Sequence, residues 1–178
     1  LLKDQVLIKS DQSPTYNFAC VVDDAEMQIT HIIRGDDHIS NTPKQLVLYE
    51  ALGFKIPEFA HIPMILGQGG GRMSKRAGAT AITEYRNMGF LAQGLVNYLM
   101  LLGWSPGNDQ EIISLKAAVE KFEITKTNKT AATFDMNKLS WLNSQYIRSM
   151  DLEKLASLLK PFLVERKLID EEEFDGKS

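Results

Sequence analysis

The residues best suited to chemistry lie in a glycine-rich segment, residues 67–76, which reads GQGGGRMSKR. Glycines let a backbone turn sharply and approach a ligand closely. Ser74, Lys75 and Arg76 then bring a hydroxyl and two cations to the same place. Backbone amides together with such side chains suit the binding of phosphates and the stabilisation of their charge. The segment lacks the Walker order of glycine, lysine and serine or threonine, and the alternative interpretation is a solvated surface loop.

A second cluster, RGDDH at residues 34–38, follows the β-branched run 29–33, which is predicted to be a strand. Ligands of open parallel sheets bind at the carboxyl ends of strands, so this position favours a site. Asp36 and Asp37 could accept hydrogen bonds from ribose hydroxyls, and Arg34 could clamp a carboxylate through two hydrogen bonds. Alternatively, one aspartate caps the next helix while Arg34 and the pair neutralise one another.

The other candidates are assigned to structure rather than chemistry. Asp23 and Asp24 have no nearby His or Cys that makes a metal-ligand set with them, so a solvated turn is expected there rather than a metal site. His31 alternates with apolar neighbours and is predicted to be packed within its strand, and His61 is also taken as structural. Three further residues are predicted to be core side chains: Cys20, Trp104 and Trp141.

An α/β arrangement is predicted to position both clusters. A helix is expected to start near Ser40, with Pro43 in its first turn, and to stop at Gly53. The apolar run 62–66 is predicted as the next strand, directly before the glycine-rich segment. Strand, helix and strand in this order indicate the crossover of a parallel sheet. Residues 6–8 are predicted as a further short strand, and residues 15–22 fit strand or helix equally.

Beyond residue 80 the pattern becomes helical. The apolar spacing and the capping residues Ser114, Asp135 and Asp151 predict helices over 82–88, 90–102, 114–122, 135–147 and 151–159. Pro161 is expected to bend or end the last of them. Residues 125–132 are predicted to be a loop, so the fold class is α/β followed by an all-helical region.

Composition sets broad limits on the function. The 178 residues are 44% hydrophobic and 24% charged, as in soluble globular proteins, and we find no apolar run long enough to cross a membrane. The one cysteine excludes an internal disulfide, so we expect a cytoplasmic protein. The net charge of −3 argues only mildly against nucleic-acid binding, because a basic groove can lie on an acidic body.

Six motifs together resemble the bacterial glutamyl-tRNA synthetases, which are class I enzymes, in order and in spacing. They are PTYNFA at 14–19, VVDD at 21–24, IRGDDH at 33–38, NTP at 41–43, RMSKR at 72–76 and FDxxKLxWxNxxYI at 134–147. The resemblance implies that residues 1–70 form the second half of a Rossmann-like nucleotide-binding domain. Residues 71–148 would form a loop of the KMSKS type and a helical stem-contact domain, and residues 149–178 would begin a helical anticodon-binding domain.

The resemblance also implies an activity, which is the joining of glutamate to ATP and the transfer of the glutamyl group to tRNA-Glu. Lys75, flanked by Ser74 and Arg76, matches the lysine that grips the ATP phosphates. Tyr16 and Arg34 match residues that contact glutamate. The implied partners are tRNA-Glu, L-glutamate and ATP with Mg²⁺, without a protein-bound metal or a membrane, and the protein is expected to be a monomer.

The remaining implied contacts concern the nucleotide. Asp37 and His38 match positions that line the ATP site, while Ile65 and Leu66 would border the adenine pocket. Whether tRNA-Gln is also charged would depend on an anticodon-binding domain and does not follow from these residues.

Two departures from the family pattern shape the expectation. The His-Ile-Gly-His signature is absent, and Arg72 replaces the usual lysine. We therefore expect an internal piece of the enzyme that forms no adenylate by itself. Two alternatives remain, a paralogue that glutamylates a modified tRNA base and a non-catalytic tRNA-binding module. The helix predicted after Asp151 argues against the first, and the intact Lys75 argues against the second.

Overall fold

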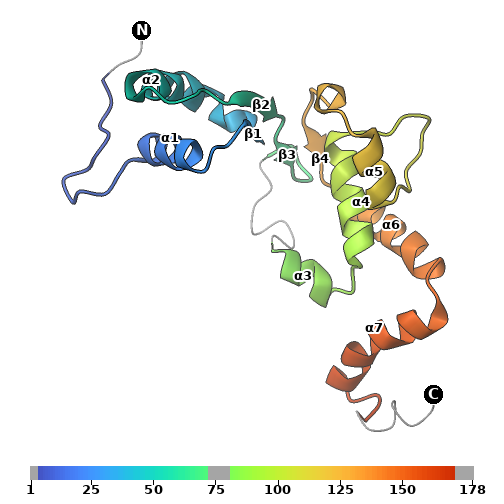
Figure 1. Cartoon of the computed structure of the whole chain (residues 1–178). Helices are drawn as coiled ribbons and strands as arrows, with labels where there is room; N and C mark the ends of the chain where they lie inside the picture. The colour runs from blue at the N-terminus through green and yellow to red at the C-terminus, as the bar shows by residue number, and fades with distance from the viewer. Residues whose placement is uncertain (1–3, 72–80, 171–178) are drawn as a thin grey trace. The chain divides into compact units, whose positions relative to one another are not determined.

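The computed structural model describes residues 4–71 and 81–170 of the chain (Figure 1). Its contacts define two compact units, which are described separately. The first comprises Leu1–Met73, Leu102–Trp104 and Glu123–Phe134, and the second comprises Ser74–Leu101, Ser105–Phe122 and Asp135–Ser178.

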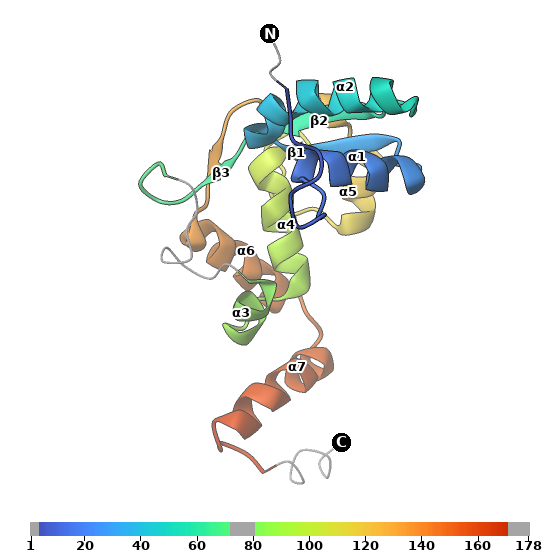
Figure 2. The same cartoon turned by 90° about the vertical axis from the view of Figure 1, so that its left-hand side faces the viewer.

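The first unit is built around two short parallel strand pairs. Its elements are α1 (Tyr16–Glu26), β1 (His31–Gly35), the 3-10 helix η1 (Asp36–Asn41), α2 (Thr42–Leu52), β2 (Glu58–Ile62), β3 (Ile65–Leu66), the 3-10 helix η2 (Ile124–Lys126) and β4 (Ala132–Thr133). β1 pairs with β2, and β3 pairs with β4. Both views show α1 and α2 beside the β1–β2 pair (Figure 2). Val21 of α1 packs with Leu48 and Tyr49 of α2 to form the core of this unit.

The predicted crossover is confirmed, since β1, α2 and β2 form a parallel strand–helix–strand unit. Gly53 ends α2 in the left-handed conformation, at φ 68°, as the helix-stop prediction requires. The second strand, however, is Glu58–Ile62 and not 62–66. Pro63 explains the difference, because proline has no N–H to donate within a ladder and the apolar run is split into β2 and β3.

Two other local predictions are wrong, and the structure decides one alternative that the sequence left open. Residues 6–8 form no strand, and only an isolated bridge joins Ile8 to Pro14. Residues 15–22, which fitted strand or helix equally, are helical from Tyr16, where α1 begins after its N-cap Thr15. The back half is also not wholly helical, because β4 begins at the last residue of the predicted loop, Ala132, and pairs with β3.

The second unit is helical in its described part. It contains α3 (Ile82–Asn87), most of α4 (Ala92–Gly103), α5 (Leu115–Lys121), α6 (Met136–Arg148) and α7 (Leu152–Glu165). Ser114, Asp135 and Asp151 accept hydrogen bonds from the first-turn amides of α5, α6 and α7, so the three predicted caps are confirmed. No helix in the described part of the chain has the length and apolar character needed to span a bilayer.

Helix α7 is longer than predicted, because it continues through Pro161 to Glu165. Proline removes the amide that would bond to the carbonyl of Ser157. Ser157 is exposed, so water can satisfy that carbonyl and the helix need not end there.

Asn97 holds the second unit together through its buried side-chain amide. It is 0% exposed, its Nδ2 donates to the Glu111 carbonyl at 2.9 Å, and its Oδ1 accepts from the Ile113 amide at 3.0 Å. The Tyr146 hydroxyl lies 2.7 Å from the same Oδ1. The amide therefore ties α4 to the segment before α5 and to α6.

We expect Asn97→Ala to lower the free energy of unfolding by about 3 kcal/mol, because it leaves several buried polar groups without partners. Urea unfolding followed by circular dichroism measures this loss. Asn137→Ala is the matched control, since Asn137 is exposed on α6. Equal midpoints for the two variants would contradict a central role for Asn97.

Candidate ligand site at the ends of the parallel strands

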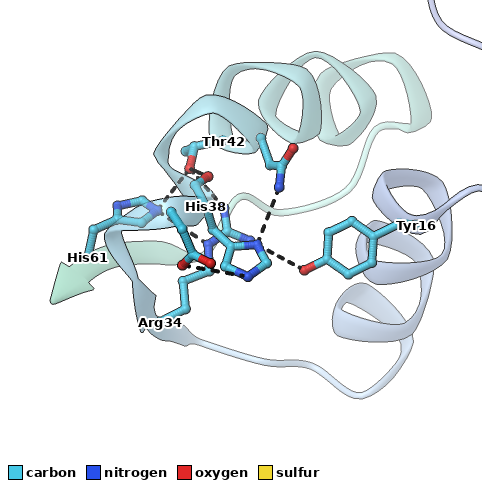
Figure 3. A network of polar contacts seen from close by, with 7 residues as sticks. Tyr16, Arg34, His38, Thr42 and His61 are labelled. Carbon is cyan, nitrogen blue, oxygen red and sulfur yellow. Dashed lines mark hydrogen bonds and ion pairs between the residues drawn. The ribbon is translucent and has the colours of Figure 1, made fainter. Parts of the chain in front are cut away.

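Arg34 lies at the carboxyl end of β1, directly opposite His61 of β2 in the strand register. Its Nε donates to His61 Nε2 at 3.3 Å, and its Nη2 donates to Thr42 Oγ1 at 2.8 Å (Figure 3). The guanidinium carbon lies 5.3 Å from the centre of the Phe59 ring, a cation–π distance. Among the described residues, no carboxylate forms an ion pair with this guanidinium. The positive charge is therefore held in place but not neutralised by these neighbours.

His38 of η1 forms the second part of the cluster. Its Nδ1 lies 3.2 Å from the Tyr16 hydroxyl and 3.3 Å from Asn41 Nδ2. Because an amide nitrogen can only donate, this arrangement assigns the acceptor role to Nδ1 and the proton to Nε2. Nε2 lies 4.0 Å from Asp37 Oδ1, so the N–H faces a carboxylate.

Thr42 joins the two parts. Its hydroxyl accepts from Arg34 and lies 3.1 Å from His61 Nε2 and 3.4 Å from the His38 carbonyl. Tyr16 is 53% exposed, so its ring borders solvent while its hydroxyl contacts His38. The cluster thus presents a cation and a phenolic hydroxyl at one edge of the strand pair.

Burial and charge shift the proton affinities of this region. Burial, followed by the Arg34 cation, lowers the pKa of His61 below its usual 6.5, so the imidazole is neutral at neutral pH. Burial, followed by a hydrogen bond with Cys20, raises the pKa of Tyr16, which keeps its hydroxyl protonated as a donor. Behind the cluster, burial and the Asp24 carboxylate raise the pKa of Tyr49 to about 12.

The structure brings together Tyr16, Arg34 and His38 from the predicted set, with Asp37 beside His38. Ile65 and Leu66 lie on β3, where Ile65 is exposed and Leu66 half-buried. Ser74, Lys75 and Arg76 lie outside the described residues.

The alternative interpretation of the aspartates is not what the structure shows. Asp36 and Asp37 occupy the first turn of η1, and α2 begins after Asn41. Neither aspartate forms a described ion pair with Arg34. The two charges therefore do not neutralise the arginine.

Sequence reasoning missed the contacts of His61 and Thr42 with Arg34. The signal was available, because a parallel crossover places residues at the carboxyl ends of both strands side by side.

Only some of the residues that were predicted to be structural are buried. Trp104 is 3% exposed, which confirms a core residue, but Trp141 is 43% exposed. His31 is exposed and bonded to Thr30, so its predicted packing is wrong, and Cys20 is half-buried.

A parallel strand–helix–strand unit with cationic and polar side chains at its carboxyl end is characteristic of nucleotide-binding α/β proteins. Within this class, the family model for class I tRNA synthetases (E and Q), catalytic domain, matches residues 1–141. The chain belongs to this family.

Individual relatives agree with this assignment. The glutamate–tRNA ligase of Geobacter sulfurreducens is 56% identical over 165 residues, which cover 93% of this chain and 35% of the relative. That of Carboxydothermus hydrogenoformans is 52% identical over 159 residues, 89% of this chain and 33% of the relative. A crystal structure of a glutamate tRNA ligase from Elizabethkingia meningosepticum, in complex with its amino acid, superposes with a TM-score of 0.84 at 36% identity and covers 97% of this chain and 38% of that one. The chain thus spans about a third of the length of these relatives.

The lowered pKa of His61 predicts a pH-dependent stability. The unfolded chain binds a proton near pH 6.5 and the folded chain only at lower pH, so stability should fall as the pH falls from 6.5 through the folded pKa. Thermal unfolding between neutral and mildly acidic pH measures this slope. We expect His61→Gln to have a shallower slope than the wild type, whereas His31→Gln, at an exposed site, should keep it. An unchanged slope in His61→Gln would contradict the assignment.

Proposed function

We propose that this chain supplies the glutamate-binding and ATP-binding second half of the catalytic region of a glutamate–tRNA ligase. The observation that carries the proposal is the Arg34 guanidinium, which is held at the strand end without a described carboxylate partner. Thr42 links it to His38, because the threonine hydroxyl contacts both Arg34 and the His38 carbonyl. The family assignment and the curated relatives named glutamate–tRNA ligase support it.

Arg34 would receive the side-chain carboxylate of glutamate. A guanidinium can donate two parallel hydrogen bonds to a carboxylate, and the charge favours glutamate over the neutral amide of glutamine. Tyr16 would contact the amino acid through its hydroxyl oxygen, since the hydroxyl proton is directed at His38 Nδ1. This arrangement accounts for the selection of an acidic amino acid.

The reaction would proceed in two transfers. An oxygen of the α-carboxylate of glutamate attacks the α-phosphorus of ATP, the bond to the bridging oxygen of the β-phosphate breaks, and pyrophosphate leaves. A hydroxyl of the terminal tRNA ribose then attacks the glutamyl carbonyl carbon and loses its proton. The bond from that carbon to the phosphate oxygen breaks, and AMP leaves. Lys75, with Ser74 and Arg76, would stabilise the charge that develops on the phosphates in the first transfer.

The remaining contacts follow the family pattern. Asp37 and His38 would line the ATP site, Ile65 and Leu66 would border the adenine, and Mg²⁺ would arrive with the nucleotide. Residues 71–148 would form the KMSKS-type loop and the stem-contact domain, whose helical part from about residue 77 would contact the inner side of tRNA-Glu. Residues 149–178 would begin the anticodon-binding helices. Residues 1–70 would form the nucleotide-binding half, in a cytoplasmic and monomeric enzyme.

Glutamate-dependent ATP–pyrophosphate exchange tests the proposal directly, with and without tRNA-Glu, in a full-length ligase carrying this chain. Lys75→Ala should reduce exchange by on the order of a hundredfold or more, because it removes a cation that acts on the transition state. Lys9→Ala, at an exposed lysine, is the matched control and should leave the rate unchanged. A protein that binds tRNA but never exchanges would instead be a non-catalytic tRNA-binding module.

The role of Arg34 gives a separate prediction. Arg34→Lys keeps the positive charge but loses the planar pair of donors, so the KM for glutamate should rise by on the order of a hundredfold. The KM for ATP should change much less, because Arg34 is proposed to contact only the amino acid. Equal changes in the two constants, measured by the same exchange assay, would contradict this assignment.

A further inference from the structure

His61 accepts the hydrogen bond that Arg34 donates from its Nε, and the strand register explains why. The two residues are direct partners in the parallel β1–β2 pair, and the distance between Arg34 Nε and His61 Nε2 is 3.3 Å. The His61 ring is stacked near Phe59, with the planes 7° apart and the ring centres 6.4 Å apart. The position of the imidazole is thus fixed by the backbone pairing and by a neighbouring ring.

The chemistry of the two groups fixes the direction of the hydrogen bond. The Nε of an arginine is always protonated and can only donate, so His61 Nε2 must accept and its proton must lie on Nδ1. This is the neutral form of the imidazole. A doubly protonated ring would bring an N–H against the N–H of Arg34 and could not hold it.

Two acceptors are needed to orient the guanidinium. Phe59 sets the distance of the cation from the ring face but leaves it free to turn within its plane. Hydrogen bonds from Nε to His61 and from Nη2 to Thr42 hold one edge of the group and prevent this rotation. The other guanidinium edge can then face a ligand.

We propose that His61 is a positioning residue, whose neutral Nε2 fixes the guanidinium plane of Arg34 for a ligand carboxylate. The identity of that carboxylate, glutamate, rests on the proposed function. The orientation of Arg34 by His61 involves only residues of the first unit and does not depend on which reaction the protein catalyses.

The proposal has a consequence for pH. The groups that face His61 are Arg34 on β1, Asp36 and His38 on η1, and Thr42 on α2, and Lys129 lines the same pocket from the segment between η2 and β4. Protonation of His61 would replace the acceptor by a cation, release the guanidinium and weaken glutamate binding. The KM for glutamate should therefore rise as the pH falls through the pKa of His61, which lies below 6.5.

The first arm of the test is kinetic and uses a full-length ligase carrying this chain. His61→Ala should raise the KM for glutamate by about tenfold in pyrophosphate exchange, with kcat and the KM for ATP changed by less than about threefold. His61→Gln offers a carbonyl acceptor in place of Nε2 and should recover most of the loss. In His61→Gln the KM for glutamate should also no longer rise as the pH falls. Because His38 is retained in this variant, the difference between its pH profile and that of the wild type is due to His61.

His31→Gln is the matched control, because His31 is exposed on β1 and its side chain is hydrogen-bonded to the neighbouring Thr30 rather than to Arg34. It should leave all three constants and the pH profile unchanged. Equal losses in His61→Ala and His61→Gln would overturn the acceptor role and leave only a packing role. An unchanged KM for glutamate in His61→Ala would also overturn the proposal.

The second arm does not depend on the reaction. In nitrogen-15 NMR spectra of the same protein, the Arg34 Nε–H signal, assigned with Arg34→Lys, should be protected from exchange with water in the wild type and in His61→Gln but not in His61→Ala. If this pattern is found and no glutamate-dependent exchange occurs, the positioning role stands and the proposed function fails. If the protection of Arg34 does not change in His61→Ala, the positioning role fails, whatever the enzyme catalyses.

Discussion

The parallel pairing of β1 with β2 is the constraint on which the candidate site depends. It sets Arg34 opposite His61, and it places the start of η1 and α2 at the same edge. Without this pairing the hydrogen bonds among Arg34, His61 and Thr42 could not form together, because the three side chains come from three different elements. The core formed by Val21, Leu48 and Tyr49 supports α1 and α2 and so holds Tyr16 and Thr42 in register with the strands.

The second unit uses buried amides in a comparable way. Asn97 ties α4 to the segment before α5 and to α6, and Asn143 of α6 accepts from the Leu91 amide at 2.8 Å. A Cβ at Gly94 would lie 3.2 Å from the Asn143 Cα, so α4 and α6 meet closely at that glycine. Helix packing in this unit is therefore specified by a few polar contacts as well as by apolar burial, since each such amide is satisfied in only one arrangement.

Local chemistry made part of this structure predictable. Ser114, Asp135 and Asp151 cap their helices because their side chains reach the first-turn amides within two or three residues, an interaction that sequence spacing specifies. The family motifs likewise identified Tyr16, Arg34 and His38 as candidates before their contacts were known. The exposure of His31 and Trp141 was not predictable in this way, because it depends on which faces of β1 and α6 find partners elsewhere in the chain. The shift of β2 has a local cause in Pro63, whose missing N–H interrupts strand pairing within the apolar run.

The way in which Arg34 is held bears on what it can do. A carboxylate in place of His61 would bind the guanidinium more strongly, but it would also neutralise the cation and compete with an acidic ligand. Neutral acceptors avoid this conflict, because the imidazole of His61 and the hydroxyl of Thr42 orient the group without opposing charge. The half-buried guanidinium then keeps its attraction for an anion while losing little conformational entropy when the anion binds. Under the proposed function, fixed geometry and a cation without a described ion-pair partner suit the distinction of a carboxylate from an amide, and the lowered pKa of His61 keeps its imidazole neutral at neutral pH.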